Sequence, residues 1–189
     1  MTKPTGIGAA LLRKEDMRFL TGRGSYVADA TRPGMVSGVF VRSPHAHARL
    51  LAIDPAAALA IPGVLAVFTG ADLAADGVGG IPCGWGITGK DGLPMAEPPH
   101  PALAQGKVRH VGDPVAFVVA ETPALARQAA EAVAVEYEAL PAVVGVSDAV
   151  KPGAPALYDD IPGNLCCDWA IGDRAATDAA FAGQRISRA

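Results

Sequence analysis

Two histidines two residues apart, His45 and His47 in the stretch VRSPHAHARL, have the clearest potential for chemistry in this sequence. Residues i and i+2 of a strand share a face, so both imidazoles could bind one zinc or copper ion. Such a site needs further ligands, and the other two histidines, His100 and His110, belong to no HExxH or CxxC pattern. The pattern favours exposed or hydrogen-bonded histidines at a strand end, with a small metal-dependent enzyme as the alternative.

Three cysteines, Cys83, Cys166 and Cys167, offer a second kind of chemistry. Adjacent cysteines are poorly placed to bridge each other, and no GxSxG elbow marks a nucleophile. We interpret Cys83, which lies near Trp85 in IPCGWG, as a small half-buried residue of a Gly-rich turn, and the adjacent pair as packing residues near a chain turn. Reactive or metal-binding roles are the alternatives. Because so few cysteines form no disulfide framework, a reducing cytoplasm is the expected location.

Pairs of carboxylates are a third candidate for acid-base chemistry. Asp159 is followed by Asp160, and Glu136 and Glu138 alternate along an expected strand. Both pairs are better explained as solvated faces than as catalytic dyads. The residue types alone therefore predict no active site in this chain.

Length and composition limit the possible classes of protein. The chain has 189 residues, half of them hydrophobic, and a formal charge of −3, which suits one domain with flanking segments. No basic block marks a nucleic-acid partner, and no apolar run predicts a secretory signal or a membrane span. The GRG of Gly22–Gly24 follows no strand and lacks the third glycine of a dinucleotide loop, so it predicts a turn.

Two strand-helix-strand units position these residues. In the first, strands are expected at 35–42 with an extension over 50–53, then a helix capped by Asp54, then a strand at 64–68. In the second, the apolar strand 115–120 is followed by a helix that begins at Thr122-Pro123 and by a half-buried strand at 133–140. The units are similar in plan but too different in sequence to predict a repeat.

A Gly- and Pro-rich insertion, at about 71–107, separates the two units. Connections beyond about 15 residues are uncommon inside a compact domain unless they are functional or ordered by a neighbour. We therefore expect the insertion to carry a partner surface. It could also border a substrate entrance through Cys83, Trp85 and His100.

Several stretches occur together in an order that resembles a known family. These are LLRKEDMRFLTGRGSYVAD, PGMVSGVFVRSPHAHARL, IDPAAALAIPGVLAVFTGADL and KVRHVGDPVAFVVAETPALARQAAEAVAVEYEALPAVV. Together they resemble the N-terminal region of the molybdopterin-binding large subunit of the xanthine dehydrogenase, aldehyde oxidase and carbon monoxide dehydrogenase family, over about residues 8–150. The resemblance implies an α+β fold, the α/β-hammerhead, with two strand-helix-strand units around the insertion.

The same resemblance implies an organisation and a function. Residues 1–20 would form an extended segment, 21–150 the hammerhead, and 151–189 a linker and the incomplete start of a molybdenum-cofactor domain, with Gly172-Asp173 before a short helix. We expect the chain to be a fragment or one part of a split subunit. The complete enzyme would use molybdopterin cytosine dinucleotide, with iron-sulfur clusters and FAD on partner subunits, to hydroxylate an aldehyde or N-heterocycle with oxygen from water.

The resemblance thus predicts a structural and docking part that is inactive without the remaining large-subunit domains. No catalytic, cofactor-binding or metal residue is expected in this chain. A free-standing binding or carrier module remains an alternative. A carrier needs a lysine displayed at a hairpin tip, and no lysine of the sequence has methionine neighbours on both sides.

Overall fold

The computed structural model of the chain describes residues 6–7, 9–10 and 12–182. The chain divides into two units, Met1–Met35 and Val36–Ala189. In the first unit the short helix α1 (Asp16–Leu20) precedes a 3-10 turn (Val27–Asp29). Gly22 has the positive φ expected of a turn glycine. Gly24 does not, and a side chain there would instead collide with the ring of Phe19.

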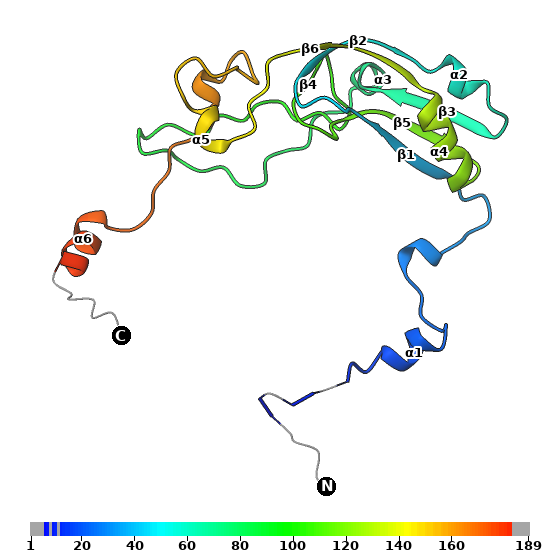
Figure 1. Cartoon of the computed structure of the whole chain (residues 1–189), viewed down its shortest axis with the longest axis horizontal. Helices are drawn as coiled ribbons and strands as arrows, with labels where there is room; N and C mark the ends of the chain where they lie inside the picture. Colours follow the sequence, from blue (N-terminus) through cyan, green and yellow to red (C-terminus); the bar gives the residue numbers. More distant parts are fainter. Residues whose placement is uncertain (1–5, 8, 11, 183–189) are drawn as a thin grey trace. The chain divides into compact units, whose positions relative to one another are not determined.

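Two antiparallel three-stranded sheets form the centre of the second unit (Figure 1). The first has the order β1-β5-β3, and the second has the order β4-β2-β6. The strands are β1 (Ser37–Arg42), β2 (Ala48–Asp54), β3 (Val64–Thr69), β4 (Lys107–Val108), β5 (Pro114–Ala120) and β6 (Ala134–Ala139). The predicted strands are confirmed to within two residues, except that β4 was not expected.

Helices connect the two sheets. Helix α2 (Ala56–Leu59) links β2 to β3, and α4 (Pro123–Ala132) links β5 to β6, so each predicted strand-helix-strand unit crosses from one sheet to the other. Exchanging β1, β2 and β3 for β4, β5 and β6 converts the strand order of one sheet into that of the other. The two halves are thus equivalent in topology, a relationship that their sequences did not reveal.

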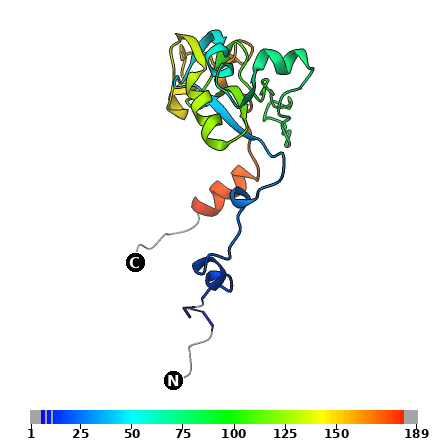
Figure 2. The same cartoon turned by 90° about the vertical axis from the view of Figure 1, so that its right-hand side faces the viewer.

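Side chains at the helix starts explain where α2 and α4 begin. Asp54 Oδ1 accepts the backbone N–H of Ala56 at 2.9 Å, and Thr122 Oγ1 accepts that of Leu125 at 3.2 Å. Both bonds satisfy donors that a helix leaves without internal partners. Helix α4 lies over β1 and β5, with Ala126 and Ala129 fully buried (Figure 2).

The core lies between the sheets and beneath these helices. Strand β5 is central in its sheet, and Val115, Ala116, Val118 and Ala120 have no exposed surface, so both of its faces are covered as its apolar run predicted. Val41 and Ile53 pack against both buried clusters. The alternation predicted for β6 is also present, with Val135 and Tyr137 half-buried and Glu136 and Glu138 exposed.

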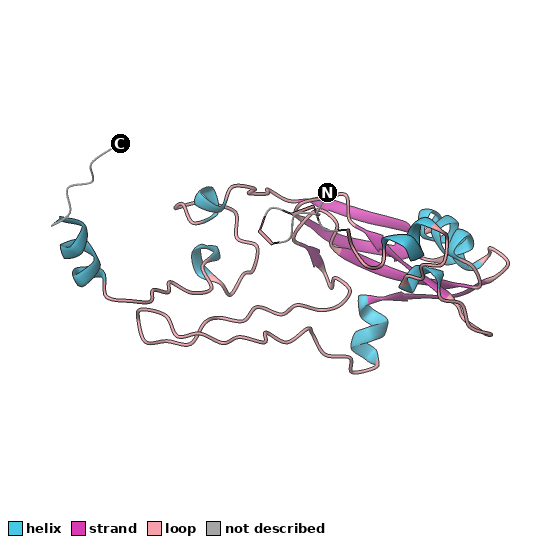
Figure 3. Cartoon of the chain, turned by 90° about the horizontal axis from the view of Figure 1, so that it is seen from below, coloured by secondary structure: helices cyan, strands magenta, loops and turns pink. Residues whose placement is uncertain are grey.

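The insertion starts with a helix that the sequence reading missed. Helix α3 (Gly70–Ala75) begins with a reciprocal capping box, in which Thr69 and Asp72 each bond the backbone N–H of the other. The chain then runs without regular structure and doubles back as a hairpin, bridged between Thr88 and Pro94, before it reaches β4 (Figure 3).

Residues after β6 return to this hairpin. The backbone N–H of Ala96 donates to the carbonyl of Cys166 at 2.9 Å, and that of Lys90 donates to the carbonyl of Asp168 at 2.8 Å. The Lys90 ammonium also pairs with the Asp168 carboxylate at 2.8 Å. Helix α5 (Val146–Ala149), a 3-10 turn (Pro162–Asn164) and α6 (Arg174–Ala182) complete the described chain. Helix α6 follows Gly172-Asp173 as predicted. In the described part of the chain, none of the helices has the length and the apolar character of a membrane span.

Candidate functional site

The two histidines of the opening motif lie on a corner between β1 and β2. Ser43 is buried, its hydroxyl accepts the backbone N–H of His45 at 3.0 Å, and its own N–H donates to the carbonyl of Asp113 at 2.9 Å. The Ser-Pro turn is therefore tied both to itself and to the turn before β5. This arrangement fixes the directions in which His45 and His47 leave the backbone.

His47 is an internal structural residue. Its side chain is only 5% exposed, and Nδ1–H donates to the carbonyl oxygen of Pro141 at 2.8 Å. A carbonyl can only accept, so Nδ1 carries the proton and Nε2 is the acceptor in this tautomer. Nε2 is buried and has no hydrogen-bond partner among the described residues.

His45 points to a different neighbour. Its ring packs on Tyr137 of β6, with centroids 4.8 Å apart and planes inclined by 51°. Burial raises the pKa of the Tyr137 hydroxyl above its ordinary value. The two imidazoles thus have different partners, one an aromatic ring and the other a backbone carbonyl.

His100 and His110 lie together at a small cavity, which also contacts Asp113. The carbonyl of Asp113 also accepts the N–H of Ser43, which comes shortly before His45 and His47. Hydrogen bonds and the cavity therefore connect the loops that carry all four histidines. In the described ranges, no three His, Cys, Asp or Glu side chains are grouped closely enough to hold an ion.

The described residues form neither a metal-ligand set nor a dinucleotide loop for the molybdenum cofactor that the resemblance implies. No three His, Cys, Asp or Glu side chains are grouped there, and the GRG turn at Gly22–Gly24 follows α1 rather than a strand.

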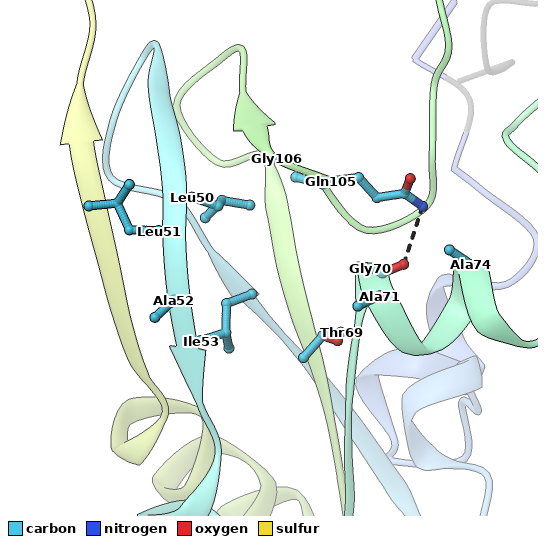
Figure 4. Close-up of a pocket in the computed structure, with 11 residues that line it drawn as sticks. Leu50, Leu51, Ala52, Ile53, Thr69, Gly70, Ala71, Ala74, Gln105 and Gly106 are labelled. Carbon is cyan, nitrogen blue, oxygen red and sulfur yellow. Dashed lines mark hydrogen bonds between the residues drawn. The ribbon is translucent and has the colours of Figure 1, made fainter.

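A groove of about 360 Å³ lies beside the part of β2 that β4 leaves unpaired (Figure 4). The side chains of Leu50 and Ile53 point across it toward Thr69, and the Gln105 amide donates to the carbonyl of Gly70 at 3.2 Å on the opposite side. Its lining is mostly apolar and holds no pair of titratable side chains. It offers packing surface, without catalytic groups.

The insertion forms a second hollow, of about 480 Å³, that was not foreseen from the sequence. Cys83 and Cys166 both line it, together with Met95 and His100. The three cysteines are free thiols. Cys83 and Cys166 are exposed, so the predictions of a half-buried Cys83 and of a packing role for Cys166 are wrong, while Cys167 is partly buried. Trp85 is 79% exposed at the same insertion. No signal in the sequence connected Cys83 with Cys166, because 82 residues separate them and the returning chain brings them together.

In each carboxylate pair, one member forms an ion pair and the other is exposed. Asp159 pairs with the Lys107 ammonium at 2.9 Å, which holds the pKa of that carboxyl below its ordinary value, while Asp160 is exposed. Glu138 pairs with Arg49 at 3.0 Å across the β2-β6 ladder, and Glu136 is exposed. The prediction of solvated faces agrees with these positions.

The α/β-hammerhead domain of aldehyde oxidase and xanthine dehydrogenase matches residues 21–141. The chain belongs to this family. The fold class and the family that the motifs predicted are therefore confirmed, and the two linked sheets described above are its hammerhead.

Hammerhead relatives match almost the whole chain. The carbon monoxide dehydrogenase large chain of Afipia carboxidovorans is 41% identical over 95% of this chain and 22% of its own length. The nicotine 6-hydroxylase large subunit of Paenarthrobacter nicotinovorans is 39% identical over 84% of this chain and 19% of its own. The chain thus spans about a fifth of the length of these relatives.

Solved structures agree with this match. A Cu,Mo-CO dehydrogenase in its carbon monoxide reduced state superposes with a TM-score of 0.70 at 39% identity, covering 97% of this chain and 23% of that one. Quinoline 2-oxidoreductase from Pseudomonas putida 86 gives 0.65 at 44% identity, covering 81% and 19%. The shared architecture includes the region after β6 in the first case.

Proposed function

We propose that this chain is the hammerhead part of the large subunit of a molybdenum hydroxylase, and that it acts in assembly and docking. The observation that carries the proposal is the match to a Cu,Mo-CO dehydrogenase over 97% of this chain. The positions of His45 and His47 support it, because His47 bonds the chain after β6 and His45 packs on Tyr137 of β6. The catalytic residues would then belong to other domains of the complete enzyme.

The complete enzyme would hydroxylate an aldehyde or an N-heterocycle with oxygen from water. It would use molybdopterin cytosine dinucleotide, and iron-sulfur clusters and FAD on partner subunits would carry the electrons away. A cytoplasmic location is consistent with three free cysteines. Within the chain we propose an extended segment at 1–20, the hammerhead at 21–150, and a linker with the start of the next domain at 151–189.

The insertion is the proposed docking surface. Trp85 is 79% exposed and Leu93 is 62% exposed on its hairpin and the adjoining loop. Exposed large apolar side chains that gather on one segment are typical of surfaces that a partner covers. The carrier alternative finds no support here, because the hairpin-tip residue Lys90 is paired with Asp168.

Affinity purification of the tagged chain from its native cells tests the proposal. We expect copurified polypeptides together with molybdenum, iron and flavin, measured by mass spectrometry, metal analysis and absorption. Trp85→Ser should reduce the recovery of those components. Val111→Ser, which changes a 67% exposed side chain in the turn before β5, is the matched control and should not reduce it. A chain recovered alone and monomeric, without molybdenum, iron or flavin, would refute the proposal.

A further inference from the structure

Three distant segments of the chain enclose the small cavity at the end of the strands. Its volume is about 120 Å³, and its polar walls come from His100 of the insertion, from Arg109, His110 and Asp113 of the turn before β5, and from Tyr158 after β6. The Tyr158 hydroxyl donates to the carbonyl of Pro99 at 3.3 Å, which joins the first and last of these segments. The cavity is therefore formed by the packing of three segments rather than by a gap within one loop.

Arg109 is held in the cavity wall by one aromatic contact and two hydrogen bonds. Its guanidinium carbon lies 4.1 Å from the centroid of the Tyr158 ring, and the side chain is part-buried. Nε–H donates to the carbonyl of Leu157 at 3.1 Å, and Nη1–H donates to that of Lys107 at 3.4 Å. A planar guanidinium stacked on an aromatic ring keeps its edges available for hydrogen bonds.

The donors of Arg109 are only partly used. A guanidinium carries five N–H groups, and two of them have carbonyl partners, which leaves three without a partner among the described residues. Among the described residues, Arg109 takes part in no ion pair within 4.0 Å; the Asp159 carboxylate, which is close enough to interact with its charge, is paired with Lys107. The side chain is a part-buried cation whose hydrogen-bond acceptors are all neutral carbonyls. A negatively charged acceptor that bound its free N–H groups would stabilise it.

Asp113 restricts the charge of that acceptor. One of its carboxylate oxygens accepts the backbone N–H of Arg109 at 2.9 Å, so its negative charge remains beside the cavity and opposes a dianion. A cation is disfavoured because His100, His110 and Asp113 are not grouped as metal ligands. A single planar carboxylate matches the guanidinium fork and adds only one charge.

We propose that this cavity binds a small monocarboxylate through Arg109, with the ring N–H groups of His100 and His110 as further donors. The site is independent of the proposed enzyme function. It requires only the hammerhead and the chain that follows β6, and nothing in the family match assigns it.

Calorimetric titration of the 189-residue chain with sodium acetate, at constant ionic strength against sodium chloride, tests the site. We expect saturable binding in the wild type and a loss of about tenfold or more in Arg109→Gln, since hydrogen bonds to charged groups are the strong ones. Arg127→Gln, at an exposed position on α4, is the matched control and should bind as the wild type does. Equal binding by the wild type and Arg109→Gln would overturn the proposal.

Two further measurements keep the test decisive if Arg109→Gln does not fold. His100→Ala and His110→Ala remove the ring N–H donors of exposed residues, and each should weaken acetate binding while the far-UV spectrum stays that of the wild type. Unchanged affinity in both variants refutes the site. Inorganic phosphate should bind more weakly than acetate, and tighter binding of phosphate refutes the monocarboxylate class.

Discussion

The Nδ1–H of His47 donates to the carbonyl oxygen of Pro141 at 2.8 Å, across 94 positions of sequence. His47 precedes β2 and Pro141 follows β6, so the bond closes the end of the β2-β6 ladder next to the backbone bond from Leu140 to His47. His47, which the sequence offered as a metal ligand, thus holds the neighbouring strands β2 and β6 together at one end.

His47→Ala should destabilise the fold without changing its metal content. The variant loses a buried hydrogen bond and leaves space in the core, a combination that costs about 1–3 kcal/mol of unfolding free energy. Urea denaturation followed by circular dichroism measures this cost. His45→Ala, which removes a half-buried ring from Tyr137, is the control and should cost less. A metal stoichiometry that falls in His47→Ala would contradict the structural role.

Gly70→Ala should also be destabilising, through crowding. A Cβ atom at position 70 would lie 2.6 Å from the carbonyl oxygen of Ala104 and 2.9 Å from that of Leu103, both of which are backbone atoms. Overpacking of this kind costs about 1–3 kcal/mol, which thermal denaturation detects as a lower Tm. Gly79→Ala meets no atom within 4 Å and should leave the Tm nearly unchanged. Equal Tm values for the two variants would be inconsistent with this packing.

The cap of α4 predicts a smaller effect. Thr122→Ala removes the hydroxyl that accepts the Leu125 N–H, and loss of such a cap costs about 1 kcal/mol. Thr122→Ser keeps the hydroxyl and should retain most of the stability in the same denaturation experiment. If the serine variant were as unstable as the alanine variant, the cap would not be the cause.

Tyr137 predicts a loss of stability at alkaline pH. Burial raises its pKa in the folded state above the ordinary value of 10.0, so folding favours the neutral phenol. Its contribution is complete below pH 10.0 and is lost as the pH rises through the higher folded value. Tyr137→Phe should therefore lose less stability than the wild type between neutral pH and pH values above 10.0. Tyr26→Phe changes an exposed tyrosine and should follow the wild type.

Local patterns were sufficient for most elements of the hammerhead. The apolar run of β5 predicted a strand covered on both faces, and Thr122-Pro123 predicted the start of α4, because capping and periodicity involve only neighbours in sequence. Helix α3 was missed although Thr69 and Asp72 have the spacing of a capping box, since the glycines that follow hid its short helical run. Strand β4 has two residues and no periodicity to detect.

The sequence by itself determined the family, the order of five of the six strands with helices α2 and α4 between them, and the absence of a recognisable catalytic motif. Only the tertiary structure decided that each strand-helix-strand unit crosses between sheets, that His47 is buried, and that Arg109 meets Tyr158 at a cavity. Helices and strands form according to the preferences of side chains within a few residues of one another. Sheet partners and cavity walls depend on contacts between distant segments, whose free energy arises only when the whole core is packed.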